Sequence, residues 1–160
     1  DEGVTIGPLV SADQQATVSE LVQDAVAKGA SLRLGGVAPE GPGHFFPPTV
    51  LADVPADARI LTEEVFGPVA PIVSFDDEDA GVAAANATEY GLAAYIFTKD
   101  LDRALRVADR IEAGMVWVNQ IHTQGVDIPF GGVKQSGLGT EHGHEGRLLF
   151  TNPKTVMIRK

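Results

Sequence analysis

The feature that most constrains the fold is the run of residues 91–119. An apolar segment rich in strand-forming residues opens it, and a helical segment with apolar residues every three or four positions follows. Asp100 is the expected N-cap of this helix, and Gly114 its expected end. The side chains predicted to face inward are Leu101, Ala104, Leu105, Ala108 and Ile111. A second apolar segment, MVWVN, starts directly after Gly114, so strand, helix and strand follow one another.

The rest of the chain repeats this alternation. Further helices are expected over residues 11–28, 77–87 and 144–149, and further strands at SLRLGG, TVLADV, VAPIVSF and the final TVMIRK. Ser11 and Gln14 form a capping-box pattern at the first helix. The predicted fold class is therefore α/β, with a largely parallel open sheet and flanking helices. Active sites of such sheets collect at the carboxyl ends of strands, which directs attention to residues 58–68 and 120–138.

Composition excludes several function classes. The chain has 160 residues, 44% of them hydrophobic and 21% charged, as in a globular domain. Its net charge of −10 and its scattered basic residues are contrary to nucleic-acid binding. No apolar run approaches the length of a membrane span, and no signal peptide opens the chain, so we expect no membrane partner. The sequence has no cysteine, which excludes disulfides and thiolate zinc sites within it and is consistent with a cytoplasmic location.

Three apparent motifs carry little weight. Residues 137–143, GLGTEHG, imitate a dinucleotide-binding fingerprint, but a polar loop precedes them where that motif needs a strand. His142 and His144 are two positions apart and so do not share a helix face, which favours a solvated polar turn, and we expect no metal site. Neither a phosphate-binding lysine pattern around Lys134 nor a nucleophile elbow around Ser136 is present.

Residues 62–69, TEEVFGPV, are more informative, because two carboxylates precede an aromatic residue and a Gly-Pro turn. Adjacent side chains usually point apart, so Glu63 and Glu64 are expected to have different roles. One interpretation is a capped turn with Glu63 in solvent. The other is a carboxylate that binds the two vicinal hydroxyls of a ribose. The residues by themselves leave both open.

Five segments together resemble one family. In chain order they are IGPLVS, PPTVLADV, TEEVFGPVAPIVSF, ANATEYGLAAYIFTKDLDRALRVADRIEAGMVWVN and PFGGVKQSGLGTEHGHEG. The chain is similar over essentially its whole length to the C-terminal part of the catalytic domain of NAD(P)-dependent aldehyde dehydrogenases. The resemblance implies oxidation of a small-molecule aldehyde to a carboxylic acid, with NAD or NADP as cofactor.

The resemblance also implies roles for single residues. Glu64 matches the glutamate that hydrogen-bonds the nicotinamide ribose, and Phe66 matches an aromatic residue beside the nicotinamide. Gln14 falls near a position that can approach the cofactor. Phe130 matches an aromatic residue of the aldehyde tunnel.

Residues 121–127 correspond to the variable segment at the substrate entrance, where His122 and Gln124 are expected to make the tunnel partly polar. Glycines 131 and 132 would let the backbone turn behind Phe130. Lys134 and Ser136 are expected to fix this loop and to take no part in catalysis.

In the family a cysteine thiolate attacks the aldehyde, and a glutamate-activated water releases the acid. The resemblance places both groups, and the dinucleotide-binding region, upstream of residue 1. We therefore expect a fragment that is inactive alone and completed by the upstream part of the same enzyme. Residues 1–153 would form a partial catalytic domain, and residues 154–160 a strand used in a homodimer or homotetramer. The alternative is a non-catalytic α/β interaction or assembly module.

Overall fold

The computed structural model describes residues 3, 5–121 and 125–160. They form two compact units, residues 1–76 and residues 77–160. The first unit contains α1 (Ala12–Ala27), β1 (Ser31–Leu34), β2 (Thr49–Ala52), the 3-10 helix η1 (Arg59–Leu61) and β3 (Val69–Pro71). The second contains α2 (Glu78–Asn86), β4 (Tyr90–Gly91), β5 (Ala93–Ile96), α3 (Leu101–Arg110), β6 (Met115–Val118), β7 (Val133–Lys134) and α4 (Gly143–Leu148).

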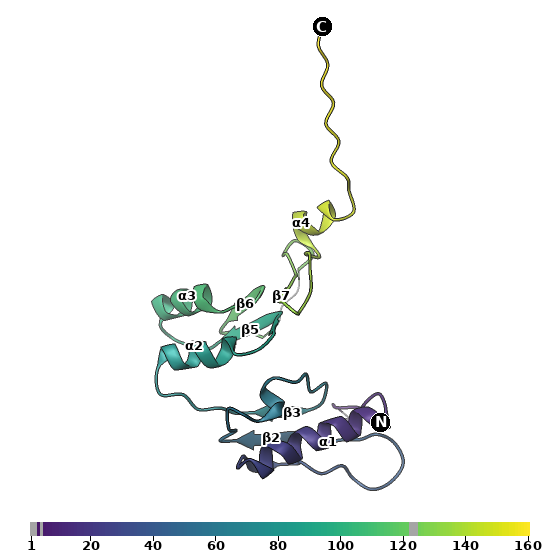
Figure 1. The fold of residues 1–160 in the computed structure, drawn as a ribbon, viewed down its shortest axis with the longest axis vertical. Helices are drawn as coiled ribbons and strands as arrows, with labels where there is room; N and C mark the ends of the chain where they lie inside the picture. The colour runs from purple at the N-terminus through teal and green to yellow at the C-terminus, as the bar shows by residue number, and fades with distance from the viewer. Residues whose placement is uncertain (1–2, 4, 122–124) are drawn as a thin grey trace. The chain divides into compact units, whose positions relative to one another are not determined.

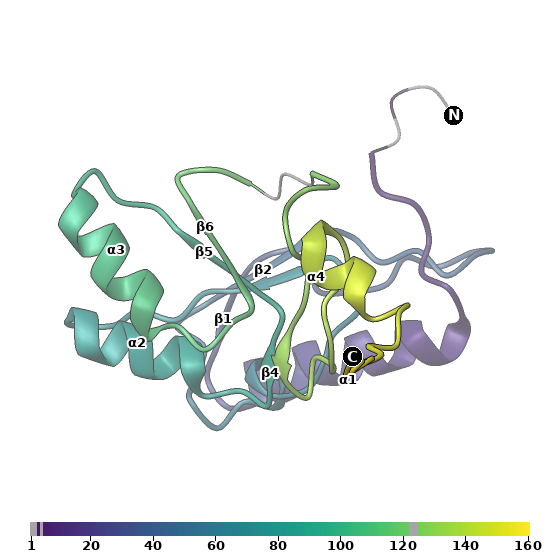
Figure 2. The ribbon, with the colours of Figure 1, turned by 90° about the horizontal axis from the view of Figure 1, so that it is seen from above.

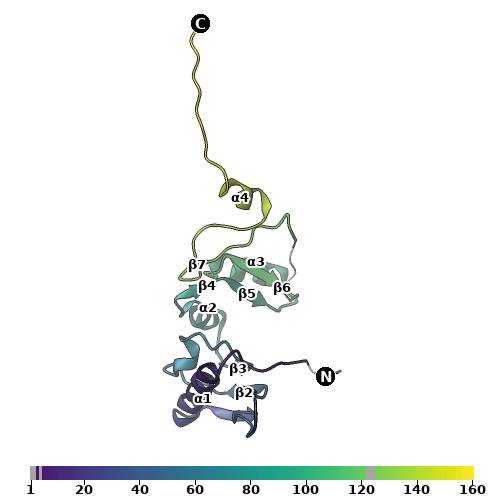
Figure 3. The ribbon, with the colours of Figure 1, turned by 90° about the vertical axis from the view of Figure 1, so that its right-hand side faces the viewer.

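Helix α1 forms where its sequence predicts, but only the Ser11 half of the expected capping box is seen, because the Gln14 amide donates to the Val65 carbonyl. Ser11 has extended backbone, and its Oγ accepts a hydrogen bond from the Gln14 N–H at 3.1 Å. Gly29 follows the C-cap residue with φ of +115°, a conformation that favours glycine, so the helix ends there. The apolar residues Val18, Leu21, Val22, Ala25 and Val26 recur at helical spacing, and all of them except Val26 are buried. This face packs on the sheet of the first unit (Figure 1 and Figure 3).

The sheet of the first unit has the order β1-β2-β3. Strand β1 is antiparallel to β2, and β3 is parallel to β2. Pro71 is the last residue of the edge strand β3, as expected for a residue without a backbone N–H. The core between α1 and this sheet consists of Val18, Leu21, Val22, Ala25, Ala30, Phe46, Leu51, Val54, Ala58 and Ile60. Long loops on either side of β2 are therefore held by a continuous apolar core.

The second unit is organised around β5, α3 and β6. The two strands are parallel with Tyr95 opposite Trp117, and the rings of these residues stack with centroids 5.4 Å apart. Asp100 caps α3, since its Oδ1 accepts from the Arg103 N–H at 3.0 Å. Strands β4 and β7 form a separate antiparallel pair.

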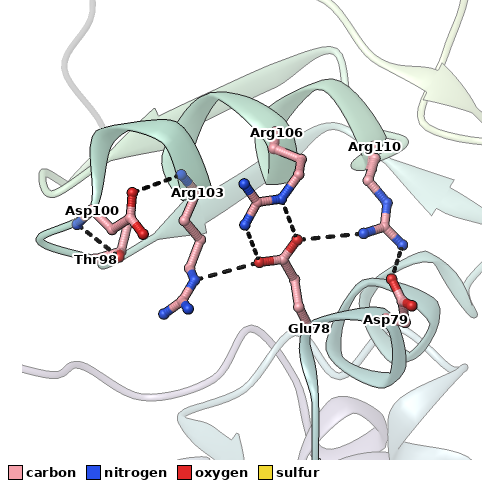
Figure 4. A network of polar contacts seen from close by, with 7 residues as sticks. All are labelled: Glu78, Asp79, Thr98, Asp100, Arg103, Arg106 and Arg110. Atoms are coloured by element: carbon pink, nitrogen blue, oxygen red, sulfur yellow. Dashed lines mark hydrogen bonds and ion pairs between the residues drawn. The ribbon is translucent and has the colours of Figure 1, made fainter.

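An ion-pair network joins α2 to α3, which lie side by side (Figure 1 and Figure 2). The Glu78 carboxylate accepts two hydrogen bonds from the Arg106 guanidinium, both at 2.7 Å. Arg103 and Arg110 also lie within ion-pairing distance of Glu78, and Arg110 pairs with Asp79 at 2.7 Å (Figure 4). The two helices are thus joined by charges as well as by apolar contact.

The inward face predicted for α3 is wrong in part. Ala104 is buried, but Leu101 and Leu105 are 71% and 63% exposed. Among the described residues the sheet beneath α3 has only two strands, which leaves these side chains largely exposed. Strand β5, expected to be buried, likewise has Tyr95 47% exposed.

Gly114 does not end the helix. Helix α3 ends at Arg110, and Ile111 already has extended backbone. A Cβ on Gly114 would overlap the carbonyl of Gly131. The glycine is thus required by a close approach of two chain segments, which periodicity could not show.

The predicted sheet is confirmed only in outline. The described residues form three small sheets, in which two strand pairs are parallel and two antiparallel. A single, largely parallel open sheet stays a prediction. Among the same residues no helix has the length and apolar character needed to cross a membrane.

The expected C-terminal strand is not formed. Residues 151–160 carry no helix or strand and extend away from α4 (Figure 1). Val156, Met157 and Ile158 are 70%, 90% and 85% exposed. A strand needs a neighbour for its backbone hydrogen bonds, and the described part of this chain supplies none to these residues. Their proposed role in assembly stays a prediction.

Candidate functional sites

The two carboxylates of TEEVFGPV lie in the segment between η1 and β3, where they have different environments. Glu63 forms two hydrogen bonds with the Arg59 guanidinium, at 2.6 and 2.8 Å. Hydrogen bonding from Arg59 holds the pKa of Glu63 below its usual range, and the positive charge of Arg59 contributes less. Desolvation of the carboxylate acts in the opposite direction. Glu63 is exposed, in agreement with the interpretation that places it in solvent, but the sequence reasoning did not foresee its pair with Arg59, four residues earlier.

Glu64 is exposed, and no hydrogen bond or ion pair within the described part of the chain occupies its carboxylate. Both of its oxygens are thus available to a ligand. The neighbouring Arg59 is already engaged by Glu63 and does not neutralise Glu64. The pair therefore has one carboxylate that holds the loop and one that is free to bind.

Phe66 is held in an unusual conformation. Its φ is +41°, in the left-handed region that a bulky residue adopts at a cost of about 1–3 kcal/mol. Its ring is 72% exposed. On one side, the Gln14 Nε2 donates to the Val65 carbonyl at 2.8 Å and to the Phe66 carbonyl at 3.4 Å. On the other side, Gly67 lies so near Val18 that a Cβ there would be 2.6 Å from the Val18 Cγ2.

Asp24 of α1 and its C-cap residue Lys28 hold the backbone just before this segment, and sequence reasoning missed both. The Asp24 Oδ2 accepts from the Arg59 N–H at 2.9 Å, and the Lys28 Nζ donates to the Asp57 carbonyl at 2.7 Å. Asp24 and Lys28 also pair with each other at 3.0 Å. Their spacing of four residues was a readable signal for the pair, as was that of Arg59 and Glu63. No local sequence pattern predicts the contacts of Asp24 and Lys28 with the backbone of Arg59 and Asp57.

The second unit carries the other candidate residue, Phe130. Its backbone exchanges two hydrogen bonds with Glu141, at 2.8 and 2.7 Å, as in an antiparallel bridge. Its half-buried ring lies 6.0 Å from the imidazole of His142. The PFGGVKQSG segment is thus folded back against the turn that starts α4.

Lys134 and Ser136 fix this segment, as predicted. The Lys134 Nζ donates to the carbonyls of Asn86 and Thr88 at 2.9 and 3.0 Å, and pairs with Glu112 at 2.6 Å. The Ser136 Oγ accepts from the Gly91 N–H at 2.9 Å. These contacts tie the loop to the end of α2 and to β4.

Phe130 lines an open hollow of about 500 Å³. Glycines 131, 132, 137 and 139 form much of its wall, and Leu92, Leu149 and Phe150 contribute apolar side chains. His142 and Glu141 are the titratable groups at its margin. The hollow is large enough for a small organic molecule and has an aromatic wall.

The structure places the predicted residues in two groups. Gln14, Glu64 and Phe66 belong to one assembly in the first unit, whereas Phe130 lies in the second. The predicted substrate residues His122 and Gln124 lie outside the described residues. Among those described, no group of three histidine or acidic residues is placed to hold a metal ion.

An exposed carboxylate beside an exposed aromatic ring, on a loop fixed by a helix, is a site suited to a ligand with hydroxyl groups and a flat apolar ring. Comparisons with known proteins identify the family of the chain. The model of the aldehyde dehydrogenase family matches residues 1–156. The chain belongs to the aldehyde dehydrogenase family.

Relatives in this family have different substrates in their names. The chain is 50% identical over 156 residues to the succinate-semialdehyde dehydrogenase [NADP(+)] of Deinococcus radiodurans, covering 98% of this chain and 33% of that protein. It is 46% identical over 161 residues to the betaine aldehyde dehydrogenase of Rhizobium leguminosarum bv. trifolii, covering 99% and 33%. This chain therefore spans about a third of the length of the curated relatives it matches.

Solved structures show the same fold. An aldehyde dehydrogenase of Mycobacterium tuberculosis complexed with NAD+ superposes with a TM-score of 0.92 at 38% identity, covering 99% of this chain and 33% of the other. An NADP-dependent enzyme of Escherichia coli superposes with a TM-score of 0.88 at 49% identity, covering 91% and 30%.

Proposed function

We propose that this chain is the C-terminal portion of an enzyme that oxidises an aldehyde to a carboxylic acid with NAD or NADP. The observation that carries the proposal is the loop that presents Glu64 and Phe66, in a chain that belongs to this family. The named relatives include an NADP-dependent enzyme, and a neighbouring structure contains NAD+, so the proposal covers both cofactors.

The residues of this loop fit a nicotinamide dinucleotide. The cofactor supplies the hydride acceptor when it is bound. The two free oxygens of Glu64 suit the two vicinal hydroxyls of a ribose, and the exposed ring of Phe66 suits a flat apolar ring. Because helix α1 fixes the loop through Gln14 and Asp24, both groups are held in place before a ligand arrives.

The remaining machinery lies outside this chain in our proposal. The sequence has no cysteine, so the thiolate nucleophile of the family must come from an upstream part of the same polypeptide. We propose that the 160 residues alone oxidise no aldehyde. In the complete polypeptide, Phe130 would form an apolar wall of the aldehyde tunnel, and His122 and Gln124 would make its entrance polar. An aldehyde with a polar or charged tail fits such a tunnel.

Substitution of the two glutamates tests the proposal in the complete polypeptide. Glu64→Gln keeps the size of the side chain but loses its charge. We expect it to slow single-turnover reduction of the cofactor by about tenfold to a hundredfold, because a displacement of about 1 Å at the reacting atoms has a cost of this order. Glu63→Gln weakens the pair with Arg59, so its main effect should be on thermal stability.

Glu40→Gln, at another exposed carboxylate, is the matched control and should react at the unsubstituted rate. Equal rates for Glu64→Gln and Glu40→Gln would refute the role of Glu64. A larger loss of rate in Glu63→Gln than in Glu64→Gln would assign the cofactor-binding role to Glu63. Aldehyde oxidation by the isolated 160 residues would refute the placement of the nucleophile.

A second function, assembly, is favoured by the exposed apolar residues of the C-terminal tail. In an extended strand Val156 and Ile158 would lie on one face, and Thr155, Met157 and Arg159 would lie on the other. We propose that residues 154–160 pair with another subunit in a homodimer or homotetramer. If the chain were instead a non-catalytic assembly module, this strand would still pair with another subunit, but Glu64 and Phe66 would bind no cofactor.

A further inference from the structure

The conformation of Phe66 depends on few contacts, and those contacts show which residue controls it. The segment 64–66 lies between two anchors, the Arg59–Glu63 pair before it and the entry to β3 after it, where the Thr49 N–H donates to the Pro68 carbonyl at 2.8 Å. Between these anchors, the side-chain contact that reaches the backbone is that of Gln14.

The backbone of Gln14 is itself anchored. It lies in the first turn of α1, and its backbone N–H is engaged by the Ser11 side chain at 3.1 Å. Its amide nitrogen meets two successive carbonyls, those of Val65 and Phe66. Both carbonyls can face one donor because Phe66 is in the left-handed region. If Phe66 relaxed to an ordinary φ, the peptide that follows it would rotate, and this arrangement would be lost.

We propose that Gln14 is a positioning residue: its amide holds Phe66 in the left-handed conformation and thereby sets the directions of the Phe66 ring and the Glu64 carboxylate. The proposal rests on the proposed function for its catalytic consequence. It differs from a direct contact between Gln14 and the cofactor, because the amide nitrogen is already bound to the protein backbone.

Two variants of Gln14 separate these possibilities in the complete polypeptide. Gln14→Ala removes the donor. Gln14→Glu keeps the size and an acceptor, but a carboxylate cannot donate to the two carbonyls and repels them. If Gln14 held Phe66, both variants would be impaired. If it accepted a hydrogen bond from a ribose hydroxyl, Gln14→Glu would be tolerated.

The neighbouring residue supplies a matched control. Gln15 is also on α1, and its Nε2 donates to the Phe45 carbonyl at 2.7 Å, in a loop that carries none of the candidate residues. Gln15→Ala therefore loses a comparable hydrogen bond from the same helix without touching the segment 64–66. It controls for a general loss of stability.

The direct measurement is fluorine NMR of the complete polypeptide with para-trifluoromethylphenylalanine in place of Phe66, recorded without cofactor. We expect the resonance to shift or broaden in both Gln14 variants and to stay unchanged in Gln15→Ala. In proteins with the natural Phe66, single-turnover hydride transfer should fall by roughly tenfold to a hundredfold in both Gln14 variants, with the KM for the aldehyde nearly unchanged.

An unshifted resonance in Gln14→Ala would overturn the proposal. So would a Gln14→Glu protein with the unsubstituted resonance and rate. Failure of the proposed function would look different, because the unsubstituted polypeptide would then bind no dinucleotide. The fluorine comparison needs no cofactor and would still decide the role of Gln14.

Discussion

Phe66 and Gly67 are adjacent residues that are constrained in different ways, Phe66 by its backbone conformation and Gly67 by a neighbouring side chain. Phe66 adopts a conformation that glycine would prefer, whereas Gly67 has no positive φ and is a glycine because of a neighbour. A Cβ at position 67 would lie 2.6 Å from the Val18 Cγ2 and 3.2 Å from its Cγ1, and Val18 is fully buried in the core. The glycine therefore lets the loop come down onto α1 behind Phe66.

This contact predicts a specific loss of stability. Gly67→Ala should lower the free energy of unfolding by about 1–3 kcal/mol, because the buried Val18 has little freedom to move away. Gly7→Ala is the control, since nothing lies within 4 Å of a Cβ there and its φ is not positive. Urea unfolding measures both. Adding Val18→Ala to Gly67→Ala should abolish the clash, so the two changes should not be additive. Additive losses would exclude this contact as the cause.

At the scale of elements, ion pairs join the two helices α2 and α3 of the second unit, whereas an apolar core joins α1 to the sheet of the first unit. Helices α2 and α3 share the network of Glu78 with Arg103, Arg106 and Arg110. The hydrogen bond from Arg106 is the main reason that the pKa of Glu78 lies below its ordinary value near 4.5. Desolvation opposes this effect, and the charges of the three arginines add to it. The Glu78 side chain is 26% exposed, so salt should weaken these pairs.

The lowered pKa gives a pH dependence with a definite sign. The folded chain binds the Glu78 proton more weakly than the unfolded chain, so the network stabilises the fold above the ordinary value near 4.5. This contribution is lost as the pH falls through the lower, folded pKa. Glu78→Gln should therefore reduce stability at neutral pH and flatten its decline in acid.

Thermal unfolding between neutral and acidic pH, at low and high salt, measures this effect. Glu89→Gln changes another exposed carboxylate of the same unit that has no ion pair, and it should leave the pH profile unchanged. Parallel profiles for Glu78→Gln and the unsubstituted chain would show that the network does not contribute to stability.

At the scale of the whole molecule, the exposed apolar residues of the second unit are the main feature. Phe97, Leu101 and Leu105 are 70%, 71% and 63% exposed, and they lie at or near the carboxyl ends of β5 and the start of α3. The chain spans about a third of the length of its curated relatives. Contact with the rest of a longer polypeptide would bury these side chains and explain their apolar character.

The C-terminal tail predicts a dependence of assembly on residues 154–160. Deletion of these residues from the complete polypeptide should give smaller species in sedimentation velocity, because a strand that pairs between subunits would be lost. The double substitution Val156→Asp and Ile158→Asp should act in the same way without shortening the chain. An unchanged sedimentation coefficient for both variants would exclude this strand as the contact.

The sequence by itself determined the features that depend on near neighbours in the chain. Ser11 and Asp100 cap their helices as expected, because each side chain accepts a hydrogen bond from a backbone N–H three residues later. The segments that resemble the aldehyde dehydrogenase family made Glu64, Phe66 and Phe130 candidate site residues. Sequence analysis also predicted that Lys134 and Ser136 fix the loop that contains Phe130. Short-range geometry was sufficient for the caps, whereas the candidate site residues came from the resemblance to the family.

Tertiary structure alone decided which side chains have partners that are distant in the sequence. The contact of Gln14 with Val65 spans 51 residues, and that of Lys134 with Asn86 spans 48. The exposure of Leu101 and Leu105 also depends on how many strands lie beneath α3. Periodicity gives the apolar face of a helix but not the extent of the surface that it meets. Whether a side chain is buried or bound depends on atoms far away in the chain, and no local pattern encodes their positions.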